Sequence, residues 1–216
     1  DRNIGLSLKW AYHHLDNNII QTFYELNTFK TLDELPRALS HATAPGFNVS
    51  AVDSKGNIGW HVMGKIAIRP DKQTGVFPLE GWSGRHDNFK YLDIDQNPHL
   101  YNPESGYIAS ANYYPEVDFG RRLNGQWQPQ ERINRLHDIL PHKNDWDSQS
   151  MKKIFLDNNV RRKNLLTNYL FTIAPKNPLV SSLKKWDGLC DIDSDACSIY
   201  YYFSRIFMEL LLKDRL

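Results

Sequence analysis

Apolar and polar positions recur with different periods along the chain, and these periods predict its helices and strands. Residues 4–10 and residues 47–53 alternate with a period of two, which is typical of strands. Another strand-like run, 57–63, follows a Ser-Lys-Gly turn in which Gly56 supplies a positive φ, so a β-hairpin is expected. Residues 18–29 carry apolar side chains at helical spacing, which predicts an amphipathic helix.

The sequence also predicts a helix start at Thr31. Glu34 follows it at the spacing of a capping box, in which each side chain satisfies a backbone amide at the helix end. The helix is expected over residues 32–41. This placement requires Pro36 to lie in or near the first turn, where its missing amide hydrogen does no harm.

The rest of the chain divides into a loop-rich stretch and a helical stretch. Residues 64–103 are rich in Gly, Pro, Asp and Asn, which indicates a long loop with short strands, and 107–111 reads as a short strand. Helices are expected in the following later segments: 129–140, 148–156, 160–173 and 198–213. This order predicts an α+β fold, with a strand-and-loop part at 1–128 and a helical region at 129–216.

Charge and hydropathy argue against two classes of partner. The formal net charge is +1 and the chain has no block of basic residues, so we expect no nucleic-acid partner. The most apolar stretch, 198–212, is interrupted by Ser204, Arg205 and Glu209, so a buried helix fits it better than a membrane span. We therefore expect a globular chain with no membrane segment.

An acidic run near the end of the chain begins like a calcium loop but does not complete one. Asp191, Asp193 and Asp195 alternate as in an EF-hand, which also needs a glycine after the third acid and a closing glutamate. Ala196 and Tyr202 occupy those two places. We interpret the run as a solvated acidic turn.

Other clusters of reactive side chains carry little weight. Ser83, His86 and Asp87 are close in sequence, but a hydrolase triad is assembled from distant segments, so a turn is the better interpretation. The eight histidines show no metal-ligand spacing, and no zinc site is expected. Cys190 and Cys197 fit a local disulfide in an oxidising compartment or two buried thiols, and their spacing does not decide between these.

An ordered set of short motifs is more specific than any of these clusters. Its segments are PGFNVSAVD at 45–53, GNIGW at 56–60, GKIAIRP at 64–70, PLEGW at 78–82, YNPESGYIASAN at 101–112, RI at 132–133 and WDG at 186–188. The set resembles the middle of the β-chain in the penicillin acylase (penicillin amidase) family, and it covers nearly the whole chain. The resemblance implies an N-terminal nucleophile hydrolase with a four-layer αββα core. The chain would then be an incomplete domain of that fold with a helix-rich last third.

The resemblance also implies a mechanism. In this family an N-terminal serine, exposed by self-cleavage of a precursor, attacks an amide, and its own α-amino group acts as the base. The chain starts with Asp1, so we expect that serine to lie upstream of these residues and the chain alone to be inactive. The expected partners are the α-chain of the same precursor and a small N-acyl amide, which could be a penicillin, an acyl-homoserine lactone or another N-acyl compound.

The motifs point to three candidate site residues. Asn112 matches the family's oxyanion-hole asparagine, and Arg132 matches the arginine that orients the active centre. Asp118 is the candidate ligand of a structural calcium ion, while catalysis itself needs no cofactor. Apart from the resemblance, Asn112 reads as an asparagine ending a strand at a turn, and Arg132 as a solvated arginine at a helix start.

The family's location favours export to the periplasm or secretion from a bacterium, and with it the disulfide. Two other interpretations stay open. One is a non-catalytic carbohydrate- or peptide-binding domain that uses the aromatic loop between Trp82 and Tyr114. The other is an acylase relative that has lost its activity.

Overall fold

The computed structural model describes residues 5–14, 16–69, 77–87, 90–115, 123 and 127–213. The chain forms two compact units, Asp1–Ile133 and Asn134–Leu216, which are described separately below. The division that we expect between residues 128 and 129 concerns the domains of a larger β-chain and stays a prediction.

The first unit begins with helices. They are α1 (Ala11–His14), α2 (Ile19–Thr28), the 3-10 turn η1 (Leu32–Glu34) and α3 (Leu35–Leu39). The strand expected at 4–10 is wrong over its described part, because residues 5–10 pair with no other strand that the structure describes. Leu6 and Leu8 are instead exposed, at 81% and 82%. An alternating pattern predicts a strand only where a neighbouring strand completes its hydrogen bonds.

The expected helix at 18–29 is confirmed as α2, with Asn18 as its N-cap. The side chain of Asn18 accepts a hydrogen bond from the amide of Gln21 at 3.1 Å. The capping box at Thr31 is wrong, because its hydroxyl lies 3.4 Å from the carboxylate of Glu34 and caps no backbone amide. The segment therefore starts as a 3-10 turn, and Pro36 lies in the first turn of α3 as expected.

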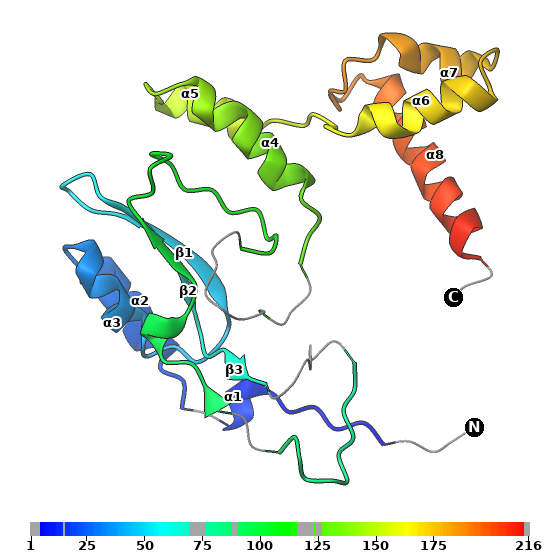
Figure 1. The fold of residues 1–216 in the computed structure, drawn as a ribbon. Coiled ribbons are helices and arrows are strands. Elements are labelled where there is room, and N and C mark those ends of the chain that lie inside the picture. The colour runs from blue at the N-terminus through cyan, green and yellow to red at the C-terminus, as the bar shows by residue number, and fades with distance from the viewer. Residues whose placement is uncertain are drawn as a thin grey trace. The chain divides into compact units, whose positions relative to one another are not determined.

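The expected hairpin is confirmed and forms the centre of the first unit (Figure 1). The strands β1 (Phe47–Val52) and β2 (Ile58–Met63) pair antiparallel across a turn in which Gly56 has a φ of 83°. Next to β2 lies β5 (His99–Tyr101), which gives the order β1-β2-β5. A smaller sheet pairs β3 (Ala67–Ile68) with β4 (Lys90–Tyr91).

The core of this unit lies between the helices and one face of the hairpin. Leu35, Leu39, Ala42 and Met63 are buried there. They pack against Val49 and other partly buried side chains of α2 and β1, so the amphipathic face of the helices is covered by the sheet.

The segment after β5 differs from expectation. No strand forms at 107–111, since these residues have no ladder partner in the described part of the chain. The segment instead follows a turn in which Gly106 has a φ of 71° and donates its amide hydrogen to the carbonyl of Pro103. It leads to Ala111, which is buried, and then to Asn112.

The last third is rich in helices, as expected. The helices are α4 (Glu131–Ile139), η3 (Leu140–His142), α5 (Ser148–Phe155), α6 (Lys163–Ile173), α7 (Pro178–Ser182), η4 (Leu183–Lys185) and α8 (Asp195–Leu212). In the second unit, the core consists of Leu170, Val180, Leu183 and Trp186, which pack against partly buried residues of α6 and α8.

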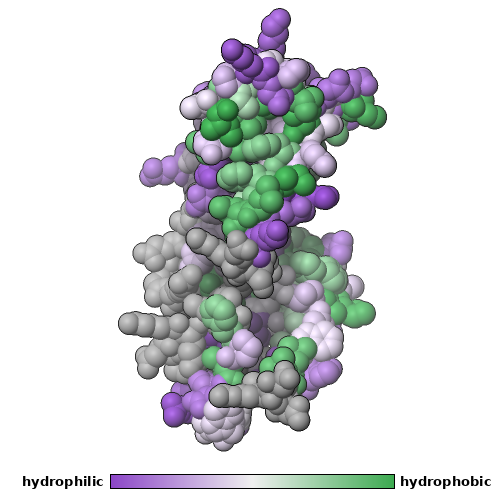
Figure 2. All heavy atoms as spheres, turned by 90° about the vertical axis from the view of Figure 1, so that its right-hand side faces the viewer, coloured by the Kyte–Doolittle hydropathy of each residue, from purple (hydrophilic) through white to green (hydrophobic). Residues whose placement is uncertain are grey.

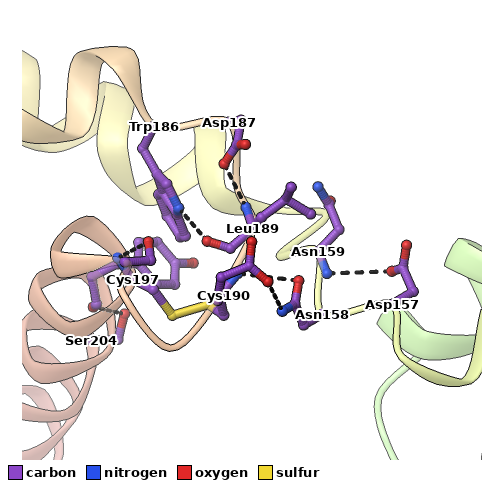
Figure 3. The surroundings of a disulfide bond; sticks show 12 residues. Asp157, Asn158, Asn159, Trp186, Asp187, Leu189, Cys190, Cys197 and Ser204 are labelled. Atoms are coloured by element: carbon purple, nitrogen blue, oxygen red, sulfur yellow. Dashed lines mark hydrogen bonds between the residues drawn. A yellow bond between two sulfur atoms is a disulfide. The ribbon is translucent and has the colours of Figure 1, made fainter. Parts of the chain in front are cut away.

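Cys190 and Cys197 form a disulfide with a Cα–Cα distance of 5.2 Å. Figure 3 shows it joining the loop after Leu189 to the first turn of α8, beside the ring of Trp186. The indole N–H of Trp186 donates to the carbonyl of Leu189 at 2.8 Å. The loop and the helix start are therefore held together by a covalent bond next to the core of the second unit.

The second unit exposes many apolar side chains, among them Leu165 and Tyr169 of α6 and Met208, Leu210 and Leu211 of α8. Figure 2 shows apolar surface, coloured green, on the face turned toward the viewer. No helix within the described ranges is long and apolar enough to cross a membrane.

Candidate functional site

The structure brings Asn112 and Arg132 together. The guanidinium Nη1 of Arg132 donates a hydrogen bond to Oδ1 of Asn112 at 3.2 Å, across 20 residues of sequence. Both side chains are exposed. The sequence motifs single out these residues separately, and the fold places them in contact.

Backbone geometry sets the position of Asn112. Its φ is 59°, in the left-handed region that asparagine tolerates better than most residues. Its carbonyl accepts a hydrogen bond from the amide of Gln128 at 2.8 Å. The chain therefore turns sharply at Asn112 and is tied to the segment that leads into α4.

Arg132 lies in the first turn of α4. The next residue, Ile133, is 1% exposed and anchors that turn in the interior. A cation near a helix N-terminus is mildly disfavoured by the helix dipole. The bond to Asn112 gives this guanidinium a polar partner that the helix itself does not offer.

The contact fixes which way the Asn112 amide points. A guanidinium carries only donors, so the amide atom that faces it must be the oxygen. The amide nitrogen, with its two hydrogens, then lies on the other side of the group. The pair thus presents an oriented N–H donor whose oxygen is held by a permanent positive charge.

Two aromatic residues close in sequence to Asn112 and Gln128 contact each other. The rings of Tyr114 and Trp127 meet edge to face, with centroids 5.5 Å apart and an interplanar angle of 73°. The hydroxyl of Tyr114 accepts a hydrogen bond from the amide of Leu123 at 3.1 Å. Sequence reasoning finds only a turn at this point, because the contacts join positions that lie apart along the chain.

The other candidate site residues are not part of the Asn112–Arg132 pair. Asp118 lies outside the described residues, so its proposed role as a calcium ligand is untested. Among the residues that the structure does describe, no group of three or more His, Cys, Asp or Glu side chains is placed to hold a metal ion. The segment with Ser83 and Asp87 forms turns, in which the amide of Asp87 donates to the carbonyl of Gly84 at 3.4 Å.

Comparison with known proteins decides the family. The chain matches the family model for penicillin amidase over residues 1–216. The chain belongs to the penicillin amidase family. The resemblance inferred from the ordered motifs is therefore confirmed, and the family's enzymes include acylases that act on different amides.

Two curated relatives from this family illustrate that range. The acyl-homoserine lactone acylase QuiP of Pseudomonas aeruginosa is 29% identical over 154 residues, which cover 71% of this chain and 18% of that protein. Penicillin G acylase of Escherichia coli is 29% identical over 157 residues, which cover 66% of this chain and 18% of that protein. The chain thus spans about a fifth of the length of these penicillin amidase relatives.

A solved structure of a family member supports the fold class. The thermostable penicillin G acylase from Alcaligenes faecalis matches with a TM-score of 0.61 at 21% identity, over 82% of this chain and 34% of that chain. The expected α+β class is confirmed by this similarity.

Proposed function

We propose that this chain is part of an amidohydrolase that cleaves a linear N-acyl amide, and that it supplies the oxyanion-binding part of the active site. The hydrogen bond from Arg132 to Asn112 carries the proposal. The substrate would be a penicillin or an acyl-homoserine lactone, the classes named for the two relatives.

The chemistry follows from where charge develops. Attack on an amide carbonyl places negative charge on its oxygen, and a preorganised N–H donor stabilises that charge in the transition state. The Asn112 amide nitrogen is such a donor, because its oxygen is occupied by Arg132. The nearby positive charge also polarises the amide, which makes its N–H groups better donors.

The nucleophile in this proposal is an N-terminal serine outside these 216 residues. Its α-amino group, with an ordinary pKa of about 8, would remove the hydroxyl proton during attack. The length of the relatives supports this arrangement, since the chain covers only 18% of QuiP. The same arrangement includes an α-chain from one precursor and export to the periplasm or beyond.

No metal takes part in the proposed reaction. A structural calcium ion bound through Asp118 remains a proposal, and the described residues do not form a site for it. The oxyanion is instead stabilised by hydrogen bonding alone, in the manner of other acyl-transfer enzymes.

The experiment is Asn112→Ala in the intact enzyme that carries this chain, with Asn168→Ala on the exposed surface of α6 as the matched control. Loss of one oxyanion donor should lower kcat by about 100- to 1000-fold with KM little changed. The control should keep full turnover. Unchanged turnover in Asn112→Ala would overturn the oxyanion role and favour the binding-domain interpretation. Absent turnover in the unaltered enzyme would instead indicate an inactive acylase relative.

A further inference from the structure

We propose that Tyr114 is a positioning residue that holds Arg132 against Asn112. The inference rests on the proposed oxyanion role of Asn112 and concerns how the fold sets that geometry. Tyr114 does not touch the reacting atoms in this proposal. It acts by holding the segment that starts at Asn112 against the segment that leads into α4.

The contact between Arg132 and Asn112 is weak and needs support from the rest of the fold. The Arg132–Asn112 hydrogen bond is 3.2 Å long, both side chains are exposed, and one nitrogen of the guanidinium takes part. Ordering an exposed arginine costs conformational entropy, and a single exposed hydrogen bond returns little. The bond therefore cannot set its own geometry, and the two backbone segments must be held by other contacts.

Tyr114 supplies such support through its hydroxyl and its ring. Its hydroxyl accepts the Leu123 amide hydrogen at 3.1 Å, and Leu123 is itself buried. Its ring and that of Trp127 meet edge to face. Gln128, the residue after Trp127, donates its amide hydrogen to the carbonyl of Asn112 at 2.8 Å.

These contacts fasten two segments of the chain to each other. One segment is Asn112 to Tyr114, and the other runs from Trp127 to the first turn of α4, where Arg132 lies. The ring of Tyr114 makes the side-chain contact of this junction, and Gln128 makes the backbone contact. Removal of the ring should let the start of α4 move relative to Asn112, while Asn112 keeps its own backbone bond.

The experiment is a double-mutant cycle in the intact enzyme, with Tyr114→Ala, Arg132→Ala and the pair combined. Tyr114→Ala should lower kcat by about 10- to 100-fold with KM nearly unchanged, since a small misplacement of an active-site group has effects of this size. In the Arg132→Ala background the same change should have almost no further effect, because Tyr114 acts through Arg132. Tyr24→Ala, at an exposed position of α2, is the control and should leave kcat unchanged.

The results distinguish a failure of the positioning role of Tyr114 from a failure of the oxyanion role of Asn112. An equal loss of kcat from Tyr114→Ala in both backgrounds would show a general structural role and overturn the inference. So would an unchanged kcat in a Tyr114→Ala enzyme whose Asn112→Ala counterpart is strongly impaired. If neither variant changes kcat, the oxyanion role itself fails. If Tyr114→Ala does not fold, Tyr114→Phe and Trp127→Phe carry the test, since each keeps an aromatic ring and should give a smaller loss that again vanishes without Arg132.

Discussion

Asn102 donates a side-chain hydrogen bond to Asn57 at 3.0 Å, and this bond joins two motifs that are far apart in sequence. The oxygen of the Asn102 amide accepts the backbone amide hydrogen of Ile58 at 2.9 Å. Asn57 in turn donates to the carboxylate of Asp53 at 2.8 Å. The glycine-asparagine hairpin and the asparagine-proline turn are thus one hydrogen-bonded unit, which fixes where the chain leaves β5.

We expect Asn102→Ala to lower the free energy of unfolding by about 1–3 kcal/mol, since it removes these bonds from a residue whose φ of 42° alanine adopts poorly. Asn102→Gly removes the same bonds but relieves the backbone strain, so it should be less destabilising. Urea unfolding of the intact protein measures both. Equal stability of Asn102→Ala and the unaltered protein would contradict a structural role for this network.

A second prediction concerns pH. His61 of β2 is 1% exposed and stacks on His99 of β5, with ring centroids 5.3 Å apart. Burial lowers the pKa of His61 from its ordinary value of 6.5 and outweighs the hydrogen bond to the Val62 carbonyl, which raises it; His99 lowers the pKa further, and the carboxylate of Asp95 raises it. The folded state therefore binds the proton less readily than the unfolded state.

The sign of the effect follows from this difference in proton binding. Stability should be constant above about pH 7.5 and should fall as the pH drops through the unfolded-state value near 6.5, because the unfolded chain then takes up a proton that the folded chain refuses. His61→Leu should flatten this part of the curve. His142→Gln, at an exposed position, should leave the curve as it was. Urea titrations between pH 8 and pH 5.5 test this, and a stability that rises on acidification over that range would contradict it.

The disulfide leads to a third prediction. A bond between Cys190 and Cys197 closes a short loop, with a sequence separation of 7, and should stabilise the protein by about 2–3 kcal/mol through the loss of entropy in the unfolded chain. Reduction with dithiothreitol should lower the free energy of unfolding by that amount. The double variant Cys190→Ala/Cys197→Ala should be as unstable as the reduced protein and insensitive to the reductant. A reduced protein as stable as the oxidised one would refute this account.

A fourth prediction compares two ion pairs of different exposure. Arg135 binds Asp157 through two hydrogen bonds of 3.0 and 2.6 Å, and this hydrogen bonding lowers the pKa of Asp157. Arg161 binds Asp138 in a more exposed setting. We expect Asp157→Asn to cost about 1–2 kcal/mol of stability and Asp138→Asn clearly less, because water screens the exposed pair more strongly. Chemical denaturation of the two variants measures the difference, and the reverse order would contradict the argument.

The sequence predicts the elements whose signal is local. The helix at Ile19–Thr28 and the hairpin around Gly56 follow from periodicity, an N-cap and a turn residue, all of which act over a few positions. The strand at 4–10 fails in its described part because a strand also needs a partner, which periodicity does not report. Thr31 and Glu34 match a capping box in type and spacing, but their side chains bond to each other.

The sequence singles out Asn112 and Arg132 but does not predict their contact. Asn112 and Arg132 come from motifs matched one at a time, and nothing in their local sequence shows that they touch. Tyr114 and Trp127 carry no local signal, since their contact depends on how the chain folds back before α4. Long-range contacts of this kind become visible only in the folded molecule.

At position 112, the side chain that would bind Arg132 most tightly is not the one that would serve the proposed activity. The difference lies in one atom, the amide nitrogen of Asn112. An aspartate at position 112 has nearly the same shape and would attract the guanidinium more strongly, since it forms an ion pair instead of a neutral hydrogen bond. It would, however, turn a second oxygen toward the substrate in place of the N–H group. In the proposed oxyanion role, an aspartate at this position would bind Arg132 more tightly but would repel the negative charge that develops on the substrate, so activity would fall while stability rises.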